Sequence, residues 1–506
     1  MKGTVETHVM LFITLFFLPL SVGEITAPME STEQEALYLT IQGFVGDWWN
    51  GSGLYPDPCG WTPIQGVSCD LYNGLWYISI LNFGPVLDNS LECFSSASFS
   101  QFLFKLKHLR SLSFFECFSA SQSTILPSTG WENLAGSLET LEFRSNRGLT
   151  GEIPIQFGYL TNLQSLVLVD NGFIGRLPQE LVNLTSLRRL SLSGNGFTGS
   201  IPDSLGKTMT ELLILDLSSN SLTGSIPSSI GGLVSLLKLD MNNNLLSGSL
   251  PGELGKLKNL TLLDLRNNSL TGGLVQSLQG MASLQDMLLS NNPLGGNLVE
   301  FKWENLQHLT NLDLSNMKLT GTIPETIAGL KRLRFLALNN NHLSGTVPPR
   351  LADLVSLNAL YLNGNNLTGE LVFTKDFFER MGRRFASWNN RNLCYRAGSF
   401  VPFGVELCNA GEAPDQNPQD KPHGNDGHLV SRLDASFGFQ ASSTNWSFVV
   451  MLVQEVVVFC LLYLFLSIWS RQSRQIRRCF QAGSRRKKEA NPAVSGSPLY
   501  RNSDPV

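Results

Sequence analysis

A unit of 24 or 25 residues occurs ten times in succession between Leu138 and Val372 of this 506-residue chain. One copy, Leu236 to Pro251, reads Leu-Leu-Lys-Leu-Asp-Met-Asn-Asn-Asn-Leu-Leu-Ser-Gly-Ser-Leu-Pro. A fixed period of this length predicts a solenoid, because one coil cannot bury its own apolar face and must stack on its neighbours. One asparagine of the unit recurs at Asn146, Asn171, Asn195, Asn220, Asn244, Asn268, Asn292, Asn341 and Asn365, with Met317 in its place in the remaining copy.

Each unit predicts a strand, a bend and a return segment. Leu-x-Leu alternates with a period of two, so its leucines should turn inward and the residues between them should face solvent. The asparagine carries donors and an acceptor, so at the bend it can satisfy buried backbone groups. The later Gly-x-Ile-Pro, as in Gly224-Ser-Ile-Pro227, turns the chain and begins the convex segment. Three copies have Leu-Val instead, at residues 274–275, 298–299 and 371–372.

The Leu-x-Gly-x-Ile-Pro form of the unit resembles plant extracellular leucine-rich repeats. The resemblance implies an α/β solenoid, a plant-type leucine-rich-repeat superhelix with N- and C-terminal disulfide caps, to which the sequence adds one transmembrane helix. The predicted segments are an N-terminal helix and disulfide cap at 24–74, irregular first repeats at 75–137, ten repeats at 138–372 and a C-terminal cap at 373–408.

Residues 1–23 have the pattern of a secretory signal peptide, with an apolar run from Val9 to Leu20 followed by small residues. The following chain should therefore fold in an oxidising compartment. Thr32-Glu-Gln-Glu35 has the pattern of a capping box that begins a helix. The apolar face of this helix consists of Leu37, Ile41, Phe44, Val45 and Trp48.

The irregular N-terminal part carries a narrower resemblance. Glu33-Gln-Glu-Ala36, Lys107-His-Leu-Arg110 and Phe114-Phe-Glu-Cys-Phe118 are similar to the plant receptor-like clade that holds Piriformospora indica-insensitive protein 2 and TOO MANY MOUTHS. Six cysteines lie in the segment expected outside the cell, and the first and last pairs resemble the cysteines of such caps. Among the fifteen possible connectivities, proximity along the chain favours Cys59–Cys69, Cys93–Cys117 and Cys394–Cys408.

The last hundred residues change composition twice. Residues 409–445 are polar and rich in Pro and Gly, which predicts a flexible stalk. Residues 446–469 are mostly apolar and about 33 Å long from Phe448 as a helix, enough to span a bilayer. Residues 470–506 hold nine Lys or Arg against two acids, so the positive-inside rule predicts a single-pass type I protein of the plasma membrane with an extracellular solenoid.

Two residues of this region are candidate sites. Glu455 is costly in lipid, which makes it a candidate for pairing with a partner helix. Cys479, beside the span, is a palmitoylation candidate. The basic tail should contact anionic lipid, and docking of a cytoplasmic protein is the alternative. Asn-x-Ser/Thr sequons make further candidates for N-glycosylation of Asn50, Asn183, Asn259, Asn267, Asn366 and Asn445.

The outward-facing positions of the strands are the candidate partner surface, because solenoids usually bind on the concave face. Phe335 and Tyr361 stand on consecutive coils, and aromatic residues are enriched in binding hot spots. Arg189, Lys238 and Arg266 are weaker candidates. A column of Asp at positions 216, 240, 264 and 313 accompanies them, and the alternative is an ordinary solvated face whose charges offset one another.

The sequence motifs do not favour an enzymatic activity or a bound cofactor. Gly194-Asn-Gly-Phe-Thr-Gly199 matches a dinucleotide fingerprint, but it keeps the register of the sister copies and no Rossmann crossover follows. No protein-kinase motif and no metal-ligand spacing occurs. The clade resemblance implies a receptor-like protein that acts with a secreted peptide or a leucine-rich-repeat receptor kinase in growth, development or the response to microbes. The alternative is an extracellular inhibitor or wall-binding protein that resembles polygalacturonase inhibitors.

Overall fold

The computed structural model describes residues 28–85, 91–396 and 401–408. The chain divides into two units, Met1–Ala413 and Pro414–Val506, and every described residue belongs to the first. The predicted signal peptide, stalk, membrane span and tail, with Asn445, Glu455 and Cys479, lie outside the described residues. Within the described ranges, no helix is both long and apolar enough to cross a membrane.

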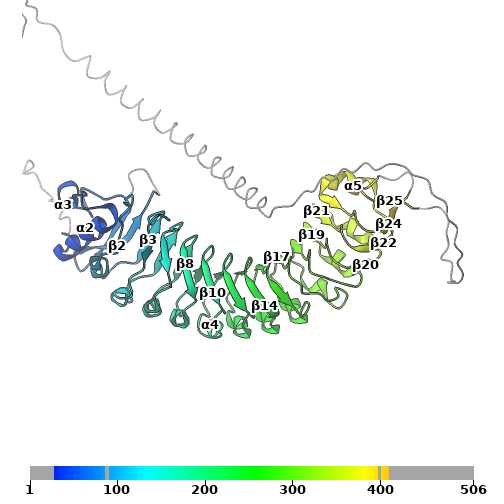
Figure 1. The fold of residues 1–506 in the computed structure, drawn as a ribbon, viewed down its shortest axis with the longest axis horizontal. Coiled ribbons are helices and arrows are strands. Elements are labelled where there is room, and N and C mark those ends of the chain that lie inside the picture. The colour runs from blue at the N-terminus through cyan, green and yellow to red at the C-terminus, as the bar shows by residue number, and fades with distance from the viewer. Residues whose placement is uncertain (1–27, 86–90, 397–400, 409–506) are drawn as a thin grey trace, which may run out of the picture. The chain divides into compact units, whose positions relative to one another are not determined.

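The predicted repeat strands form one sheet of fourteen strands along the concave side of the solenoid (Figure 1). Successive coils add parallel strands in register, so that Leu215, Leu239 and Leu263 lie side by side and are buried. The first pair, β1 with β2, is antiparallel. In sheet order the strands are β1 (Val67–Tyr72), β2 (Leu75–Phe83), β3 (Ser111–Phe115), β5 (Thr140–Arg144), β7 (Ser165–Val169), β9 (Arg189–Ser191), β11 (Ile214–Asp216), β13 (Lys238–Asp240), β15 (Leu262–Asp264), β17 (Asp286–Leu288), β18 (Asn311–Asp313), β19 (Phe335–Ala337), β21 (Ala359–Tyr361) and β23 (Phe385–Ala386).

Two smaller sheets lie where the sequence predicted only a turn. The residues before Gly-x-Ile-Pro pair with the next coil as short parallel strands, and a glycine such as Gly224, at φ 78°, ends the strand. The seven-stranded sheet consists of β4 (Thr124–Ile125), β6 (Leu149–Gly151), β8 (Gly172–Arg176), β10 (Gly196–Gly199), β12 (Ser221–Gly224), β14 (Leu245–Ser249) and β16 (Ser269–Thr271). The four-stranded sheet consists of β20 (Ser344–Gly345), β22 (Asn366–Glu370), β24 (Asn392–Tyr395) and β25 (Glu406–Leu407).

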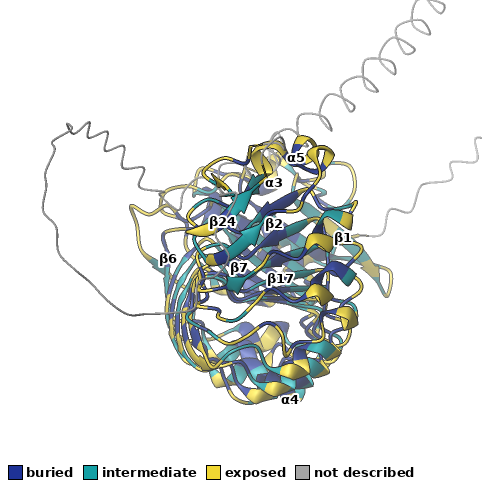
Figure 2. Cartoon of the chain, turned by 90° about the vertical axis from the view of Figure 1, so that its right-hand side faces the viewer, coloured by how far each residue is buried: buried dark blue, intermediate teal, exposed yellow. Residues whose placement is uncertain are grey.

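Short helices return the chain along the convex side (Figure 1), and each combines exposed residues with buried ones, while most residues of the concave strands are buried or intermediate (Figure 2). Pro251 precedes one of them at φ −69°, and Val275 precedes the next at φ −77°, so a copy without Ile-Pro follows the same backbone path. The short convex helices are η1 (Gln101–Lys105), η2 (Trp131–Leu134), η3 (Ile155–Tyr159), η4 (Gln179–Asn183), α4 (Leu205–Thr208), η5 (Ser228–Gly232), η6 (Gly252–Lys256), η7 (Gln276–Gly280), η8 (Trp303–Asn305), η9 (Glu325–Gly329) and η10 (Pro349–Asp353).

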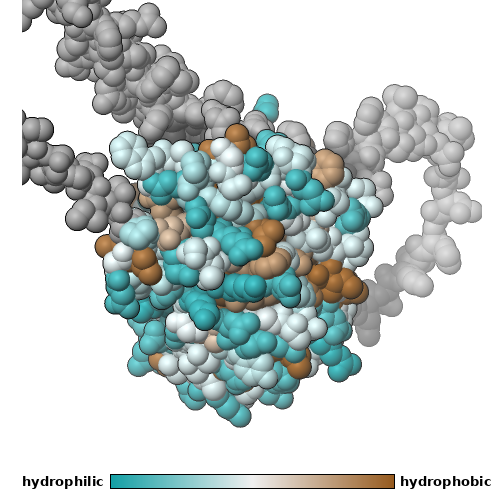
Figure 3. All heavy atoms as spheres, turned by 90° about the vertical axis from the view of Figure 1, so that its left-hand side faces the viewer, coloured by the Kyte–Doolittle hydropathy of each residue, from teal (hydrophilic) through white to brown (hydrophobic). Residues whose placement is uncertain are grey.

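Helix α2 (Ser31–Val45) covers the N-terminal end of the core with buried Leu37, Ile41 and Phe44. Beyond it, Gly46 adopts φ 114° and ends the helix. Trp48 therefore lies outside the helix with 70% of its surface exposed, which makes its predicted place on the apolar face wrong. Seen from this end, apolar residues form several separate patches among polar ones (Figure 3).

The start of α2 also differs from the prediction. Glu30 is the N-cap, and its carboxylate accepts a hydrogen bond from the backbone N of Glu33 at 2.7 Å and another from the Thr32 hydroxyl. The predicted capping box with Thr32 as N-cap is therefore wrong, because a carboxylate two residues earlier already satisfies the first turn. The short helix α3 (Gly51–Leu54) follows α2.

The irregular first repeats join the same sheet through β2 and β3, and their core is aromatic. Phe83, Phe114 and Phe143 stack on successive coils with ring centroids 5.0 Å apart at each step. Disulfides brace both ends of the solenoid, and they are the pairs that proximity along the chain favoured. They join Cys59 to Cys69, Cys93 to Cys117, and Cys394 to Cys408.

The C-terminal cap continues the solenoid. Helix α5 (Lys375–Met381) is followed by η11 (Gly382–Arg384), and Phe385 then begins β23, the last strand of the concave sheet. The helical segment ends at Arg384. The reason is that Leu360 and Tyr361 of the preceding coil pair with Phe385 and Ala386 as strand partners.

Candidate functional site: the concave sheet

The recurring asparagines hold the backbone of the concave coils. In one coil, the Asn244 side-chain oxygen accepts from the Leu222 backbone N at 3.0 Å, and its amide donates to the carbonyls of Leu217 and Met241 at 2.9 and 3.2 Å. These partners belong to two successive coils, so the side chain ties one coil to the next. Such buried groups would otherwise be unpaired. This column, the buried ladder, is structural and unavailable to a partner.

The ladder adapts where the asparagine is missing. Asn341, the next rung after Met317, accepts from two backbone N–H groups, those of Met317 at 2.9 Å and Leu319 at 3.0 Å. Asn146, the first rung, likewise accepts from Cys117 and Phe118. One carbonyl oxygen can serve both donors because it has two lone pairs.

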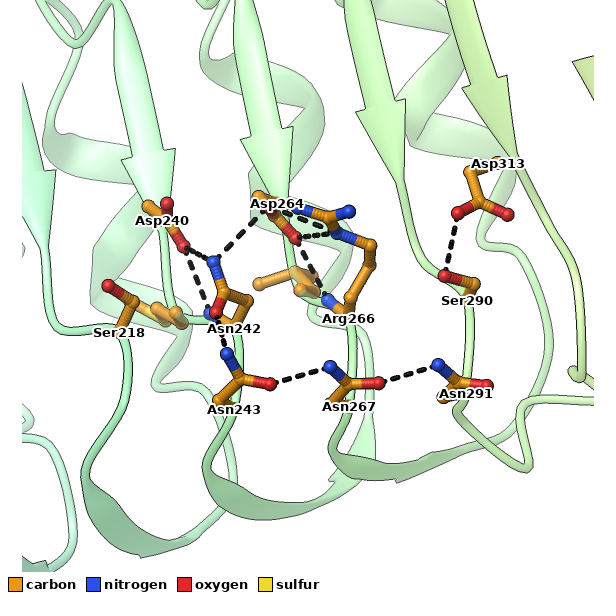
Figure 4. Close-up of polar contacts among 12 residues, drawn as sticks. Ser218, Asp240, Asn242, Asn243, Asp264, Arg266, Asn267, Ser290, Asn291 and Asp313 are labelled. Carbon is orange, nitrogen blue, oxygen red and sulfur yellow. Dashed lines mark hydrogen bonds and ion pairs between the residues drawn. The ribbon is translucent and has the colours of Figure 1, made fainter. Parts of the chain in front are cut away.

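A second asparagine column lies one residue earlier and faces solvent at the edge of the concave sheet (Figure 4). Asn267 adopts φ 55°, donates to Asn243 at 2.5 Å and accepts from Asn291 at 2.6 Å, and Asn316 continues the row. Asparagine tolerates this left-handed backbone better than most residues. The glycosylation candidate Asn267 is therefore a link in an exposed amide row. The other described sequon residues are also exposed: Asn50, Asn183, Asn259 and Asn366.

Aspartates occupy one outward-facing position on successive strands. Asp216, Asp240 and Asp264 are register partners, and Asp264 is only 3% exposed. Figure 4 shows Asp240 and Asp264 on neighbouring strands. Asn242 donates to Asp240 through its backbone N at 3.0 Å and its side-chain amide at 2.7 Å. Burial raises the pKa of Asp240 to about 7, and the negative charges of Asp264 and Asp216 add to the effect, while the Asn242 N–H and Arg266 oppose it.

The three basic candidates have different surroundings. Lys238 lies exposed on β13, and Arg189 begins β9 with its Nε buried and without a hydrogen-bond partner among the described residues. Arg266 follows β15 instead of standing on it, so its predicted strand position was wrong. It folds back onto Asp264, with Nη2 2.6 Å from Oδ2, and this hydrogen bond raises the pKa of Arg266.

Phe335 and Tyr361 form a ring pair on the concave face. Their centroids are 5.7 Å apart and their planes are inclined by 61°, an edge-to-face arrangement. Phe335 is the register partner of Ala359, and Tyr361 that of Ala337, so each ring stands beside an alanine on the neighbouring strand. Both rings are half-buried, which leaves part of each available to a partner.

Sequence reasoning missed two aromatic residues at the end of this surface. Trp388 follows β23 by two residues, and its carbonyl accepts from the Gly364 backbone N. Phe403 packs edge-on against Trp388, with centroids 5.8 Å apart, and is 82% exposed. The sequence signal that could have placed Trp388 is Asn390, which continues the buried ladder 25 residues after Asn365.

No cluster of His, Cys, Asp or Glu suited to a metal ion occurs among the residues that the structure describes. The concave face offers hydrogen bonding through its exposed amides, charge through its aspartates, and aromatic contact through Phe335 and Tyr361. These are the means of binding a partner.

Comparison with known proteins identifies the family of this chain. A family model described as "Leucine-rich repeat region" matches residues 108–400. Piriformospora indica-insensitive protein 2 of Arabidopsis thaliana is 60% identical over 157 residues, 30% of this chain and 37% of that protein. Protein TOO MANY MOUTHS, also from Arabidopsis thaliana, is 35% identical over 144 residues, 27% of each chain. Each match spans less than two fifths of the relative's length.

Among solved structures, the leucine-rich-repeat ectodomain of the Arabidopsis receptor kinase HAESA, in complex with an extended IDA peptide hormone, aligns with a TM-score of 0.50 and 28% identity. The alignment covers 63% of this chain and 53% of that one. The expected solenoid is thereby confirmed. Because the family model spans more than half of the sequence, the chain belongs to the leucine-rich-repeat family, and the plant receptor-like proteins named above are among its relatives.

Proposed function

We propose that this chain is a kinase-lacking receptor-like protein of the plasma membrane. Its extracellular solenoid binds a secreted peptide, or the ectodomain of a leucine-rich-repeat receptor kinase, and thereby modulates signalling in growth, development or the response to microbes. The observation that carries this proposal is the Phe335–Tyr361 ring pair on the concave sheet. Aromatic anchors of this kind dominate the energetics of protein interfaces.

Three further observations support the proposal. The HAESA ectodomain, whose fold is similar, was solved with a peptide hormone bound. The relative of 60% identity has a name that refers to insensitivity to Piriformospora indica, which favours a role in the response to microbes. The expected signal peptide, membrane span and basic tail favour an extracellular solenoid held at the plasma membrane.

A pull-down of the intact chain tests the proposal. The protein carries a C-terminal tag, is solubilised in mild detergent from plant membranes, and its partners are identified by mass spectrometry. We expect to recover a leucine-rich-repeat receptor kinase or a secreted peptide. The double variant Phe335→Asp/Tyr361→Asp should lose that partner, because two buried charges in the contact are costly to desolvate.

The matched control is Tyr159→Asp, which places the same charge on an aromatic residue of the convex helix η3 that is 60% exposed. This variant should retain the partner. Recovery of wall hydrolases without any kinase or peptide would contradict the proposal and favour the inhibitor alternative. Unchanged partner binding by the double variant would contradict the assignment of Phe335 and Tyr361.

A further inference from the structure

The chemistry of the concave surface changes along its length. Strands β11 to β18, with the two residues that follow each of them, carry five aspartates and two basic residues on the concave side, a formal net charge of −3 from 2 − 5, and Asp264 among them is buried and paired with Arg266. Strands β19, β21 and β23 present no acidic residue. The charged residues of the first group are Asp216, Lys238, Asp240, Asp264, Arg266, Asp286 and Asp313.

The second half carries the aromatic row, which we define as Phe335, Tyr361, Trp388 and Phe403. Phe335 contacts Tyr361, and Trp388 contacts Phe403. Tyr361 pairs with Ala386 of the next strand, and Trp388 lies two residues beyond Ala386, so the row runs diagonally across the last coils. It continues the concave face onto the C-terminal cap.

The cap holds Phe403 on the surface without using it in the core. Cys394–Cys408 and the pairing of β24 with β25 close the loop on both sides. Gly404 adopts φ 68°, and a Cβ added there would lie 2.7 Å from the Cβ of Trp388, so the backbone passes directly against the base of the Trp388 side chain. An apolar ring that is 82% exposed is available for contact with a partner.

We infer that the concave surface binds an extended peptide segment with Lys or Arg in the half that lies over the aspartates and aromatic or branched apolar residues in the half that lies over the aromatic row. This inference rests on the proposed function and specifies the chemistry of the ligand. From β11 to β23 there are seven strand-to-strand steps of about 4.8 Å, and the resulting length of roughly 34 Å matches about ten extended residues.

Charge complementarity favours a peptide whose Lys or Arg residues lie over the aspartates. The aspartates of β11, β13 and β15 repel one another, and this repulsion contributes to the raised pKa of Asp240. A cationic side chain placed over them relieves the repulsion and steers association. The aromatic row supplies the area from which water is excluded, so it should dominate affinity, whereas the aspartates should set direction and selectivity.

A selection from random ten-residue peptides tests the inference. The intact chain is held in nanodiscs by its C-terminal tag, and bound peptides are sequenced. We expect the selected peptides to carry Lys or Arg in one half and aromatic or branched residues in the other. Phe403→Ala and Trp388→Ala should each lower the affinity of these peptides at least about tenfold, while Trp388→Phe should retain most of it. Binding should weaken as salt is raised.

The control is Trp61→Ala, which removes an indole that is 75% exposed at the N-terminal cap and should leave affinity unchanged. Phe403 is too exposed to support the fold, so loss of binding by Phe403→Ala cannot be a folding defect. Selection of acidic peptides, or affinities unchanged by both Phe403→Ala and Trp388→Ala, would overturn this inference and leave the proposed function intact. If no peptide is selected and the pull-down recovers no receptor kinase, the proposed function itself fails.

Discussion

The coils of this solenoid carry two asparagine columns, one residue apart, whose surroundings differ completely. Asn268 lies in the buried ladder and bonds only to backbone, while Asn267 lies at the edge of the concave face and bonds to the side chains of Asn243 and Asn291. Asparagine therefore stabilises the buried backbone in one column and forms part of the exposed surface in the other. Positions that repeat in every coil stabilise the fold. Candidate binding residues are therefore the outward-facing residues that differ from the repeat.

The largest effect should follow the loss of a rung that serves two donors. Asn341→Ala leaves the backbone N of Met317, the backbone N of Leu319 and the carbonyl of Leu314 without partners, and should destabilise the protein by about 4 kcal/mol. Asn365→Ala removes a partly exposed rung that accepts from one N–H and should cost about 2 kcal/mol. Denaturant unfolding followed by circular dichroism measures the stability of both variants. Equal losses of stability would contradict the idea that Asn341 matters more because Met317 replaces the asparagine of the preceding coil.

In the N-terminal cap a buried carboxylate accepts a backbone hydrogen bond, whereas in the coils buried amides do so, and replacing the carboxylate by an amide tests this difference. Glu33 is 4% exposed and accepts from the Ile78 backbone N at 3.2 Å. Burial raises its pKa from 4.5 to about 7, and the nearby Glu30 adds to the effect. The folded protein thus binds this proton more tightly than the unfolded chain, so the stabilising contribution is present below pH 4.5 and is lost as pH rises through about 7.

Glu33→Gln should therefore leave stability at pH 4 unchanged and raise it at pH 8 by roughly 2–3 kcal/mol. Thermal unfolding at the two pH values checks this. Glu35→Gln, at an exposed position of the same helix, is the control and should change stability little at either pH. A loss of stability at pH 8 in Glu33→Gln would show that the charge is needed.

A smaller gain in stability at high pH is expected from a substitution on the outward face of the concave sheet. The pKa of Asp240 is raised from 3.8 to about 7, so its stabilising proton is also lost as pH rises through that range. Asp240→Asn keeps an acceptor for Asn242 and should raise stability at pH 8 by about 1 kcal/mol, because partial exposure screens the repulsion. Asp203→Asn, at an exposed position, provides the control for thermal unfolding at pH 8 and should shift nothing.

The smallest effect belongs to the exposed amide row. Asn267→Gly keeps the left-handed backbone and removes only the side chain, so stability should change by less than about 0.5 kcal/mol. Asn268→Gly, one residue further along, should cost several times as much because it removes a buried rung. Unfolding curves compare the pair. Mass spectrometry of the secreted solenoid shows whether Asn267→Gly also removes a glycan.

Some features of the fold and of the candidate site could be predicted from the sequence, and others could not. The period of the Leu and Asn positions predicted the concave strands, their inward faces and the role of Asn244 correctly. It did not predict the two smaller sheets, because those strands are two to five residues long and are stabilised by pairing with the adjacent coil. It also did not place Trp388, whose coil is marked only by Asn390, or Phe403, which no repeat marks and which meets Trp388 in the cap closed by Cys394–Cys408.

By itself the sequence determined which side chains turn inward, since a repeat of constant length stacks every coil on the last and returns each position to the same place. Only the tertiary structure decided what the outward side chains meet. Arg266 folds onto Asp264, Asn267 joins residues 24 positions away on each side, and Tyr361 meets Phe335. These contacts depend on the lateral spacing of neighbouring coils and on local backbone dihedral angles, which the repeat pattern does not record.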